Sequence, residues 1–386
     1  MAADDGMPLV VHVSPRVQAR GGIETLHGYH RELPLRQEFV ALFDRSPDPV
    51  AGYTNLNAGW STSLGVMRRR FARVMAARPD CMVVYHNGWG LPLFHDLDRA
   101  ARRVVMMHAD PAYHAPDLPG LRGLLDGALA ITPALHAELA RAFPELDGRR
   151  TAHYRVPIES PPAVLPPRAA VACRPVVLGY AGRIERAQKR LDRLPGFLSA
   201  LLATGLDFRF ELVGAGAYRA DLERMLGGQA RFHGWVSREE YWRILAGWDA
   251  MVFFSDHEGG PIALLEGMAV GAIPFYPARG GSWADEYLPQ VNPAGYYPPG
   301  ELATLAEALA GVFRRPEAEL AEMRQATQML VASHRGESYK TDCMNFLQQI
   351  ASCPRISQQR PRGHFATDWL PLGLVSRLAP EALRRA

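Results

Sequence analysis

Two positively charged side chains follow one predicted strand at a spacing that suits a phosphate site. The apolar stretch Val176 to Ala181 predicts a strand, and Gly182 ends it. Arg183 follows at once, and Lys189 stands six residues further on. A loop of this length can curl so that both cations face one point, where they would neutralise a diphosphate without a metal ion. A solvated basic loop is the alternative reading.

The composition bears on that choice. The chain has 43 basic residues, but only Lys189 and Lys340 among them are lysines. Arginine is therefore expected on any solvated loop of this protein, whereas lysine is not. The presence of Lys189 in the loop favours a functional role for it.

Two carboxylates follow a second predicted strand, Ala250 to Phe254. Glu258 stands in the loop beyond it, and Glu266 stands about one and a half turns inside a predicted helix, Pro261 to Val270. At the carboxyl end of a parallel strand, such carboxylates can accept hydrogen bonds from sugar or ribose hydroxyls. The alternative is one glutamate that favours the helix dipole and one that is solvated.

The loop between these carboxylates also supplies backbone donors. Pro261 is expected at the first helical position, where its missing N–H costs nothing. The free N–H groups of that first turn, together with the helix dipole, favour an anion. A third glycine turn, Leu212 to Gly216, is not a dinucleotide fingerprint, because Arg219 occupies the third glycine position, and by itself it indicates a tight turn.

The first half of the chain places histidines at strand ends. The predicted strand Arg103 to Met107 precedes His108-Ala109-Asp110, and the predicted strand Cys81 to Tyr85 precedes His86. Either histidine could face a ligand, but in a chain with 13 histidines a structural role is the alternative for both. Asp96-Leu97-Asp98 fits a DxD metal pattern, yet its place before a helix favours an N-cap or a solvated face.

Strands and helices that alternate along the chain must position these residues. Such alternation predicts βαβ units with parallel sheets. In the first half, the other predicted elements are a strand over Met7 to Val13, a helix over Ile23 to Leu33, and strands over Phe39 to Phe43 and Ala128 to Ile131. In the second half they are strands over Phe208 to Val213 and Arg231 to Phe232, and helices over Leu191 to Ala203, Tyr218 to Leu226, Arg238 to Ala246 and Leu302 to Ile350.

A proline-rich stretch, Val156 to Pro175, divides the two series. Its six prolines exclude a helix or a central strand, so we expect an interdomain linker. The predicted domains are residues 1–165 and 166–350, two α/β halves that enclose a cleft. The tail, residues 351–386, is expected to pack back on the first domain.

Composition excludes several classes of protein. The 386 residues suit two or three domains, and 48% hydrophobic residues exclude disorder. A formal net charge of +3 is too small for a dedicated nucleic-acid binder. No apolar run is long enough for a membrane span, the first residues lack a signal pattern, and the four cysteines form no CxxC pair. We therefore expect a reduced, cytoplasmic protein.

A basic amphipathic helix leaves peripheral membrane contact open. Over Leu64 to Arg78, apolar residues form one stripe beside Arg68, Arg69, Arg70 and Arg73. Such a helix could lie on the inner face of the cytoplasmic membrane. The alternative is a sheet-covering helix in an arginine-rich protein.

Four segments in order carry a family resemblance: GRIERAQK, LVGAG, FHGWVS and SDHEGGPIALLEGMAVGAIP. Together they resemble the nucleotide-sugar half of retaining GT-B glycosyltransferases of the large family 4, which includes bacterial mannosyl-, glucosyl- and galactosyltransferases. The likeness covers Val176 to about Leu309. Gly21-Gly22-Ile23-Glu24 is also similar to the family's N-terminal glycine-rich loop.

The resemblance implies roles for individual residues. Arg183 and Lys189 would hold the donor diphosphate, Glu258 would face the donor sugar, and Glu266 would face the ribose hydroxyls. His108 would contact the donor sugar, so the implied catalytic set is Glu258, His108, Arg183 and Lys189. The further implied donor contacts are Gly22, Gly234, Trp235, Val236, Gly260, Pro261 and Ile262.

The sequence also departs from the family pattern. Gly260 stands where a large apolar residue is usual, and Gly267 stands where alanine is common. Val156 to Glu159 lacks the usual Asn-Gly. These differences lie in the loops expected to face the donor, so they bear on the choice of donor rather than on the fold.

The resemblance thus implies a GT-B fold, with two Rossmann-like domains, and a retaining hexosyltransferase. The donor would be a UDP- or GDP-sugar, the acceptor a saccharide, free or lipid-linked, in cell-surface polysaccharide or oligosaccharide synthesis, and no metal, other cofactor or nucleic acid would be needed. Two alternatives stay open. One is a catalytically silent GT-B module that only binds saccharide or nucleotide. The other is a Rossmann oxidoreductase, although its GxGxxG turn is absent from the sequence.

Overall fold

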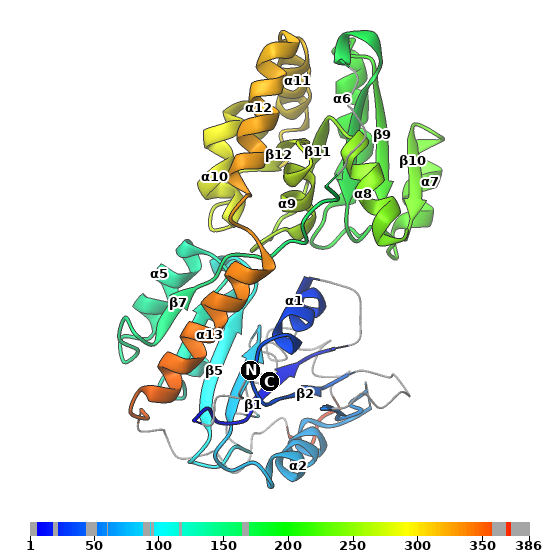
Figure 1. The fold of residues 1–386 in the computed structure, drawn as a ribbon. Coiled ribbons are helices and arrows are strands. Elements are labelled where there is room, and N and C mark those ends of the chain that lie inside the picture. The colour runs from blue at the N-terminus through cyan, green and yellow to red at the C-terminus, as the bar shows by residue number, and fades with distance from the viewer. Residues whose placement is uncertain are drawn as a thin grey trace. The chain divides into compact units, whose positions relative to one another are not determined.

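The structure is a computed structural model that describes residues 6–17, 22–43, 52–59, 61–87, 93, 96–115, 118–163, 170–356 and 368–371. The chain forms two compact units (Figure 1). Met1–Arg155 and Glu337–Ala386 make the first, and Val156–Gly336 makes the second. Each unit is an α/β domain built around its own sheet, as the alternation of elements predicts.

In the first unit, seven described strands form one parallel sheet in the order β3-β2-β1-β4-β5-β6-β7. The strands are β1 (Val10–Ser14), β2 (Gln37–Ala41), β3 (Tyr53–Asn55), β4 (Met82–His86), β5 (Arg102–Met107), β6 (Gly127–Ala130) and β7 (Thr151–His153). Strand β1 pairs with both β2 and β4, so the direction of winding reverses beside it. The central strands are buried along nearly their whole length, which explains their continuous apolar runs.

In the second unit, six described strands form a parallel sheet in the order β10-β9-β8-β11-β12-β13. The strands are β8 (Val176–Ala181), β9 (Phe208–Val213), β10 (Ala230–Gly234), β11 (Ala250–Val252), β12 (Ile273–Pro277) and β13 (Tyr296–Tyr297). The order reverses between β8 and β11, which pair directly at Leu178 and Ala250. Ligands of open α/β sheets bind at the carboxyl ends of the strands at such a switch point. The loops that carry Lys189 and Glu258 follow these two strands.

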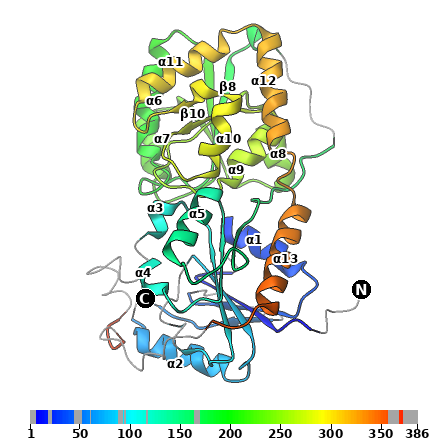
Figure 2. The ribbon, with the colours of Figure 1, turned by 90° about the vertical axis from the view of Figure 1, so that its left-hand side faces the viewer.

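Helices pack on both sheets. The first unit holds α1 (Gly22–Arg31), α2 (Leu64–Met75), α3 (Pro111–His114), α4 (Leu118–Leu121), α5 (Pro133–Ala142) and α13 (Gly336–Ser352). The second holds α6 (Leu194–Ala203), α7 (Arg219–Leu226), α8 (Arg238–Gly247), α9 (Ile262–Ala269), α10 (Trp283–Val291), α11 (Leu302–Phe313) and α12 (Glu317–Leu330). Figure 2 shows the strands of the second unit between α6 and α12.

The last long helix does not lie in the domain to which the sequence assigned it. Residues 302–350 form three helices, and the third, α13, belongs to the first unit rather than to the second. Its buried side chains cover β6, where a Cβ at Gly127 would lie 2.5 Å from Cδ1 of Ile350. Its Tyr339 hydroxyl lies 2.7 Å from Nε2 of His30. The boundary therefore falls after Arg155, and α13 returns because its apolar face fits the first sheet.

Several other boundaries differ from the expectations. The predicted helix over 191–203 begins as a 3₁₀ turn, Leu191–Arg193, and continues as α6. Within the expected linker, residues 171–173 form another 3₁₀ turn. Strand β12 is absent from the sequence prediction, and its Pro274 and Pro277 are unusual in a central strand. The carbonyl of Pro274 accepts a hydrogen bond from the buried amide of Asn292 at 2.8 Å.

Helix α2 does not present all of its arginines to solvent. Arg68 is buried, and its guanidinium bonds Asp96 and Asp368 at 2.7 Å each. The Asp368 carbonyl also accepts from the Gly65 N–H at 2.6 Å, so residue 368 lies against α2. Arg70 donates to the Leu56 carbonyl, which leaves Arg69 and Arg73 exposed.

Within the described ranges, the structure has no helix with the length and apolar content that a membrane crossing requires.

Candidate functional site

Lys189 and Glu258 form an ion pair at the switch point of the second sheet. The ammonium of Lys189 contacts Oε1 of Glu258, and both side chains are largely buried, at 15% and 8% exposure. The Ser255 hydroxyl donates to the same Oε1 at 2.8 Å. The structure thus brings together a cation and a carboxylate that the sequence predicted separately.

Arg183 lies on the same loop but has other partners. Its guanidinium donates to Glu185 and to Oε1 of Gln188, both at 2.8 Å. The Gln188 amide in turn donates to the His257 carbonyl at 2.8 Å. Arg183 is half exposed, at 52%. Among the described residues, the side chains of these two cations thus bond different acceptors, although both are linked to residues 257–258.

The glycines of the turn after β9 let it pack directly on this loop. Gly214 has a positive φ of 133°, and a Cβ there would lie 2.0 Å from the Gly182 carbonyl oxygen. A Cβ at Gly216 would lie 2.2 Å from the Ile184 carbonyl oxygen. The Ile184 N–H donates to the Ala215 carbonyl at 2.9 Å. The LVGAG segment thus supports the loop that holds Arg183.

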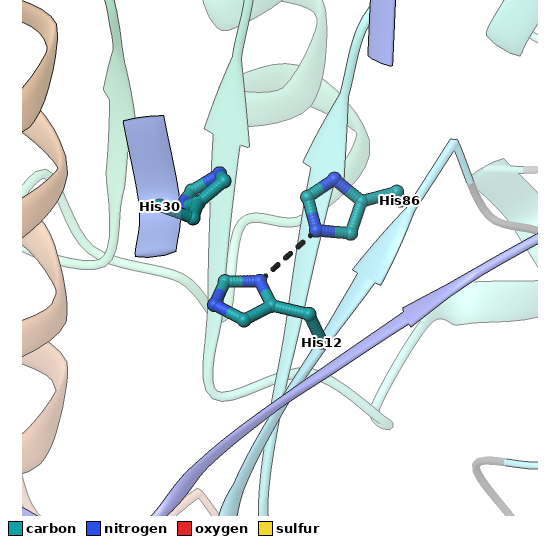
Figure 3. A group of neighbouring side chains, drawn as sticks. All are labelled: His12, His30 and His86. Carbon is teal, nitrogen blue, oxygen red and sulfur yellow. Dashed lines mark hydrogen bonds between the residues drawn. The ribbon is translucent and has the colours of Figure 1, made fainter. Parts of the chain in front are cut away.

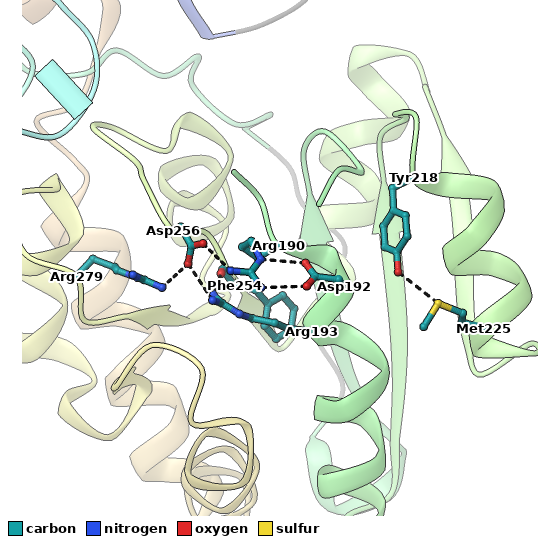
Figure 4. A network of polar contacts seen from close by, with 8 residues as sticks. All are labelled: Arg190, Asp192, Arg193, Tyr218, Met225, Phe254, Asp256 and Arg279. Carbon is teal, nitrogen blue, oxygen red and sulfur yellow. Dashed lines mark hydrogen bonds and ion pairs between the residues drawn. The ribbon is translucent and has the colours of Figure 1, made fainter. Parts of the chain in front are cut away.

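Asp256 organises a network of arginines beside the ion pair (Figure 4). Its carboxylate bonds Arg190 at 2.7 Å and Arg193 at 2.9 Å, and it also contacts Arg279. These three arginines and the two carboxylates of Asp256 and Asp192 leave one positive charge in excess. The arginines hold the pKa of Asp256 below its usual value, although its burial alone would raise it. The network fixes the loop before Glu258.

Glu266 is buried inside α9 and is held by two residues of α8. Arg238 donates to one carboxylate oxygen and the Tyr241 hydroxyl to the other, both at 2.6 Å. Burial raises the pKa of Glu266, while these two partners act in the opposite direction. The Arg238 guanidinium also lies over the Trp242 ring at 4.7 Å. In this state both oxygens of Glu266 therefore have donors from the protein.

The other expected donor contacts of the second unit lie in two loops. Gly234 ends β10 with a φ of 73°, and Trp235 beside it is 55% exposed. Val236 is partly exposed, as are Gly260 and Ile262, whereas Pro261 is buried. Helix α9 begins at Ile262 rather than at Pro261, which is its N-cap and leaves the helix start without a side-chain cap.

His108 lies in the first unit, just beyond β5, within a chain of histidines. Its Nδ1 is 2.6 Å from the Tyr154 hydroxyl, and its Nε2 is 2.8 Å from Nδ1 of His86. Burial, together with the nearby His114, lowers the pKa of His108 to about 3. His108 is therefore neutral near pH 7, with both ring nitrogens in use.

The remaining candidates of the first unit have structural partners or lie at element ends. Asp96 forms an ion pair with Arg68, and Asp98 accepts a hydrogen bond from the Ala100 N–H at 2.8 Å. Both aspartates of the DxD pattern therefore have structural partners. Gly22 is the first residue of α1. Gly21 and residues 357–367 and 372–386 of the tail lie outside the described residues.

Residue patterns alone missed the side chains that hold the site together. Gln188, Asp256, Arg238 and Tyr241 all stand next to or within the motifs, but nothing in their spacing marks them. Four of their contacts, Gln188 with His257, Asp256 with Arg190, and Arg238 and Tyr241 with Glu266, join residues 25 to 69 positions apart in the chain. Nothing in the sequence distinguishes Arg190 and Arg193 from the other arginines of this arginine-rich chain.

Comparison with known proteins supports the geometric reading. Residues 175–315 match the family described as Glycosyl transferases group 1. A 2-deoxystreptamine glucosyltransferase of Streptomyces kanamyceticus is 26% identical over 239 residues. That alignment spans 61% of this chain and 57% of the relative, so a large part of each protein lies outside it.

Solved structures resemble most of the chain. The pneumococcal O-GlcNAc transferase GtfA, solved with UDP and GlcNAc, has a TM-score of 0.68 at 10% identity and covers 90% of this chain and 100% of its own. Anabaena HepE, solved with UDP and glucose, has a TM-score of 0.66 at 13% identity over 88% and 99%. The lipopolysaccharide outer core galactosyltransferase WaaB has a TM-score of 0.63 at 16% identity over 88% and 99%.

At 10–16% identity, the solved structures show that the folds are similar and no more. The family match covers residues 175–315, which lie in the second unit. The expected pair of parallel-sheet α/β domains is confirmed. The chain has the GT-B fold, and its residues 175–315 match the family described as Glycosyl transferases group 1.

Proposed function

We propose that this protein is a retaining hexosyltransferase of family 4 that takes a hexose from a nucleoside-diphosphate sugar. The observation that carries the proposal is the Lys189–Glu258 pair at the switch point of a group 1 domain. It places a cation suited to a diphosphate beside a carboxylate suited to sugar hydroxyls. Arg183 supplies a second cation on the same loop.

The leaving nucleoside diphosphate gains negative charge as the glycosidic bond breaks. Lys189, Arg183 and the uncapped start of α9 at Ile262 would stabilise that charge. Lys189 would exchange part of its contact with Glu258 for a phosphate oxygen, and Glu258 would then be free to accept from a sugar hydroxyl. Glu266 would bind the ribose hydroxyls in place of one of its present donors.

Retention is supported by family resemblance. With no evident nucleophile, the acceptor would attack from the face that the diphosphate leaves. Its hydroxyl proton would pass to the departing phosphate oxygen, and the acceptor oxygen would bond to the anomeric carbon. His108 is proposed as a polar contact of the donor sugar, and Gly22 as a backbone contact of the phosphates.

The nucleobase would lie near Gly234, Trp235 and Val236. UDP is the favoured diphosphate, because two structural neighbours were solved with UDP; a GDP-sugar is the alternative. The exposed Trp235 ring offers a surface on which a base can stack.

The acceptor is proposed to be a saccharide, free or lipid-linked, in cell-surface polysaccharide or oligosaccharide synthesis. The galactosyltransferase neighbour of the lipopolysaccharide outer core favours it. A second candidate is a cyclitol hydroxyl, favoured by the name of the Streptomyces relative. The protein would work in the cytoplasm, with Arg69 and Arg73 as the residues of α2 available to an anionic membrane.

The test is a donor panel followed by a transfer assay. UDP-, GDP- and ADP-sugars are screened by thermal shift, with NAD as the comparison for the oxidoreductase alternative. The donor that stabilises the protein is then offered with saccharide, lipid-linked and cyclitol acceptors, and the product anomer is read by NMR. Retention of the donor's anomeric configuration supports the proposal, and inversion contradicts it.

The same assay addresses the alternatives. Donor binding without transfer or donor hydrolysis would indicate a silent binding module. Addition of Mg²⁺ or Mn²⁺ to chelator-treated protein should leave the transfer rate unchanged, because the arginine and lysine cations would neutralise the diphosphate. A rate that depends on either ion would contradict this part of the proposal.

A further inference from the structure

Three buried histidines of the first unit bring one ring nitrogen each to a common point. His12 comes from β1, His30 from α1 and His86 from the end of β4, and none is more than 1% exposed. The three nitrogens lie within 4.8 Å of one another. Figure 3 shows the hydrogen-bonded pair His12 and His86 with the His30 ring beside it.

The position of the His12 proton follows from a neighbouring amide. The Gln37 amide nitrogen donates to the carbonyls of His30, at 2.6 Å, and Leu33, at 3.3 Å. Its oxygen, at 3.1 Å from Nε2 of His12, must therefore accept from that nitrogen. Nε2 of His12 carries the proton, and Nδ1 presents a lone pair.

The same logic continues along the chain of rings. Nε2 of His86, at 3.1 Å, donates to Nδ1 of His12, so Nδ1 of His86 accepts from Nε2 of His108 at 2.8 Å. Nδ1 of His108 then accepts from the Tyr154 hydroxyl at 2.6 Å. The hydrogen bonds run in one direction, from Tyr154 to Gln37.

Only one of the two ring nitrogens of His30 has a hydrogen-bond partner among the described residues. Its Nε2 lies 2.7 Å from the Tyr339 hydroxyl, but its Nδ1 has no hydrogen-bond partner among the described residues. A cavity of about 10 Å³ borders His12 and His30 and is otherwise lined by apolar and sulfur side chains. A buried ring nitrogen without a partner costs free energy in a core that has no ligand.

We propose that Nδ1 of His12, Nδ1 of His30 and Nε2 of His86 bind a late first-row transition-metal ion such as Zn²⁺ or copper. Imidazole suits these ions, whereas Mg²⁺, Ca²⁺ and Mn²⁺ prefer oxygen ligands, which this group does not supply. The inference is independent of the proposed transferase activity.

The separations fit such a site. Two nitrogens at about 2.0–2.1 Å from a tetrahedral ion lie about 3.3 Å apart, close to the 3.1 Å between Nδ1 of His12 and Nε2 of His86. His30 closes the remaining gap by a small movement of its ring. The cavity beside it has room for about one water as the fourth ligand.

Each ligand is also oriented through its other ring nitrogen. Gln37 holds His12, Tyr339 holds His30, and His108 holds His86. Metal-binding histidines almost always have a partner of this kind, which fixes the tautomer and the ring orientation.

Metal binding would reverse part of the hydrogen-bond chain. His86 must present a lone pair at Nε2, so its proton moves to Nδ1 and is donated to Nε2 of His108. His108 then carries its proton on Nδ1 and donates to the Tyr154 oxygen, while the Tyr154 O–H turns to another direction. The number of protons does not change. Binding of the ion would therefore be accompanied by a change in the tautomer of His108.

The experiment uses the full chain without an affinity tag. The protein is unfolded in a chelator, refolded with Co²⁺ or Zn²⁺ and dialysed, and the metal is then counted by mass spectrometry. We expect one ion per chain and the visible absorption bands of four-coordinate Co²⁺. His30→Phe should hold no ion, and Tyr339→Phe should bind it about 10–100-fold more weakly.

A matched control and a second readout keep the proposal testable. His136→Gln removes a histidine of α5 in the same unit that is not one of the three ligands, and it should keep the ion. Circular dichroism of each metal-free variant checks folding. In ¹⁵N-histidine NMR, the proton of His108 should move from Nε2 to Nδ1 when Zn²⁺ binds. Absence of a bound ion, retention of the ion by His30→Phe, or an unchanged His108 tautomer on binding would overturn the proposal.

Discussion

The ammonium of Lys189 contacts the carboxylate of Glu258, although 69 residues separate them in the chain. The pair joins the loops that follow β8 and β11, the neighbouring strands at the switch point. It places the two groups that the proposed reaction needs, one for the phosphates and one for the sugar, within one contact. Both are largely buried, so each depends on the other for its charge balance.

Lys189→Ala should lower the kcat/KM for transfer by about 10²–10³-fold, the range for loss of one donor that stabilises a developing anion. Lys340→Ala is the matched control, because Lys340 is the other lysine and pairs with Glu32 in the first unit. The measurement is initial rate against donor concentration. Full activity of Lys189→Ala would remove this residue from the proposed mechanism.

The double variant Lys189→Ala/Glu258→Gln separates charge balance from catalysis. Removal of Lys189 alone takes away the ammonium that contacts the buried Glu258 carboxylate, which should reduce the free energy of unfolding by about 1–3 kcal/mol. The neutral glutamine should restore most of that loss in urea unfolding while transfer stays low. Recovery of transfer would show that Lys189 acts only on stability.

Tyr241→Phe should weaken donor binding by roughly 10-fold, with a smaller effect on kcat, because Glu266 loses the hydrogen bond that orients one of its oxygens. Burial raises the pKa of Glu266, and the loss of a stabilising donor raises it further. The KM for the donor should therefore rise more steeply as the pH falls. Tyr218→Phe is the control, since that hydroxyl donates to the sulfur of Met225 at 3.3 Å rather than to Glu266. An equal effect of this variant would point to general destabilisation.

Asp368→Asn should reduce the free energy of unfolding of the first unit by about 1–3 kcal/mol, because it removes one of the two carboxylates that pair with the buried Arg68. Arg69→Gln, on the exposed side of the same helix, should change it by less than about 0.5 kcal/mol. Urea unfolding of the full chain provides the comparison. Equal stability of the two variants would show that the contact of residue 368 with α2 contributes little.

The histidine cluster should make the chain lose stability as the pH falls below about 6.5. Burial lowers the pKa of His12 to about 4 and that of His108 to about 3. Between these values and 6.5 the unfolded chain binds more protons than the folded one, so lowering the pH favours unfolding. At pH 5 the loss of unfolding free energy should be about 2 kcal/mol for each of these two histidines, measured by urea unfolding in the presence of a chelator.

His27→Phe tests the same argument with one substitution. His27 is fully buried, and neither of its ring nitrogens has a hydrogen-bond partner within the described part of the chain. The variant should be at least as stable as the parent at pH 7.5 and clearly more stable at pH 5. His153→Gln, on an exposed histidine of β7, should leave the pH profile unchanged. A profile that His27→Phe does not flatten would contradict the burial argument.

The sequence by itself determined much of the second unit. The predicted bounds of β8 and β9 agree with the structure, because strands buried in a parallel sheet appear as continuous apolar runs that end in glycine. The residue types and their distance from the ends of predicted strands marked Arg183, Lys189, Glu258 and Glu266 as candidates, and the family resemblance supplied their expected roles. Their local positions depend on short-range geometry that a sequence pattern expresses directly.

Only the tertiary structure decided which groups those residues meet. Asp256 gathers three arginines from two segments, Glu266 is held by residues of another helix, and α13, near the end of the chain, belongs to the first unit. The histidines of the first unit come from separate elements, and their periodicity marks them only as core positions. Such contacts follow from strand order, register and helix packing, which bring distant residues together, and the spacing of residues along a chain carries no record of them.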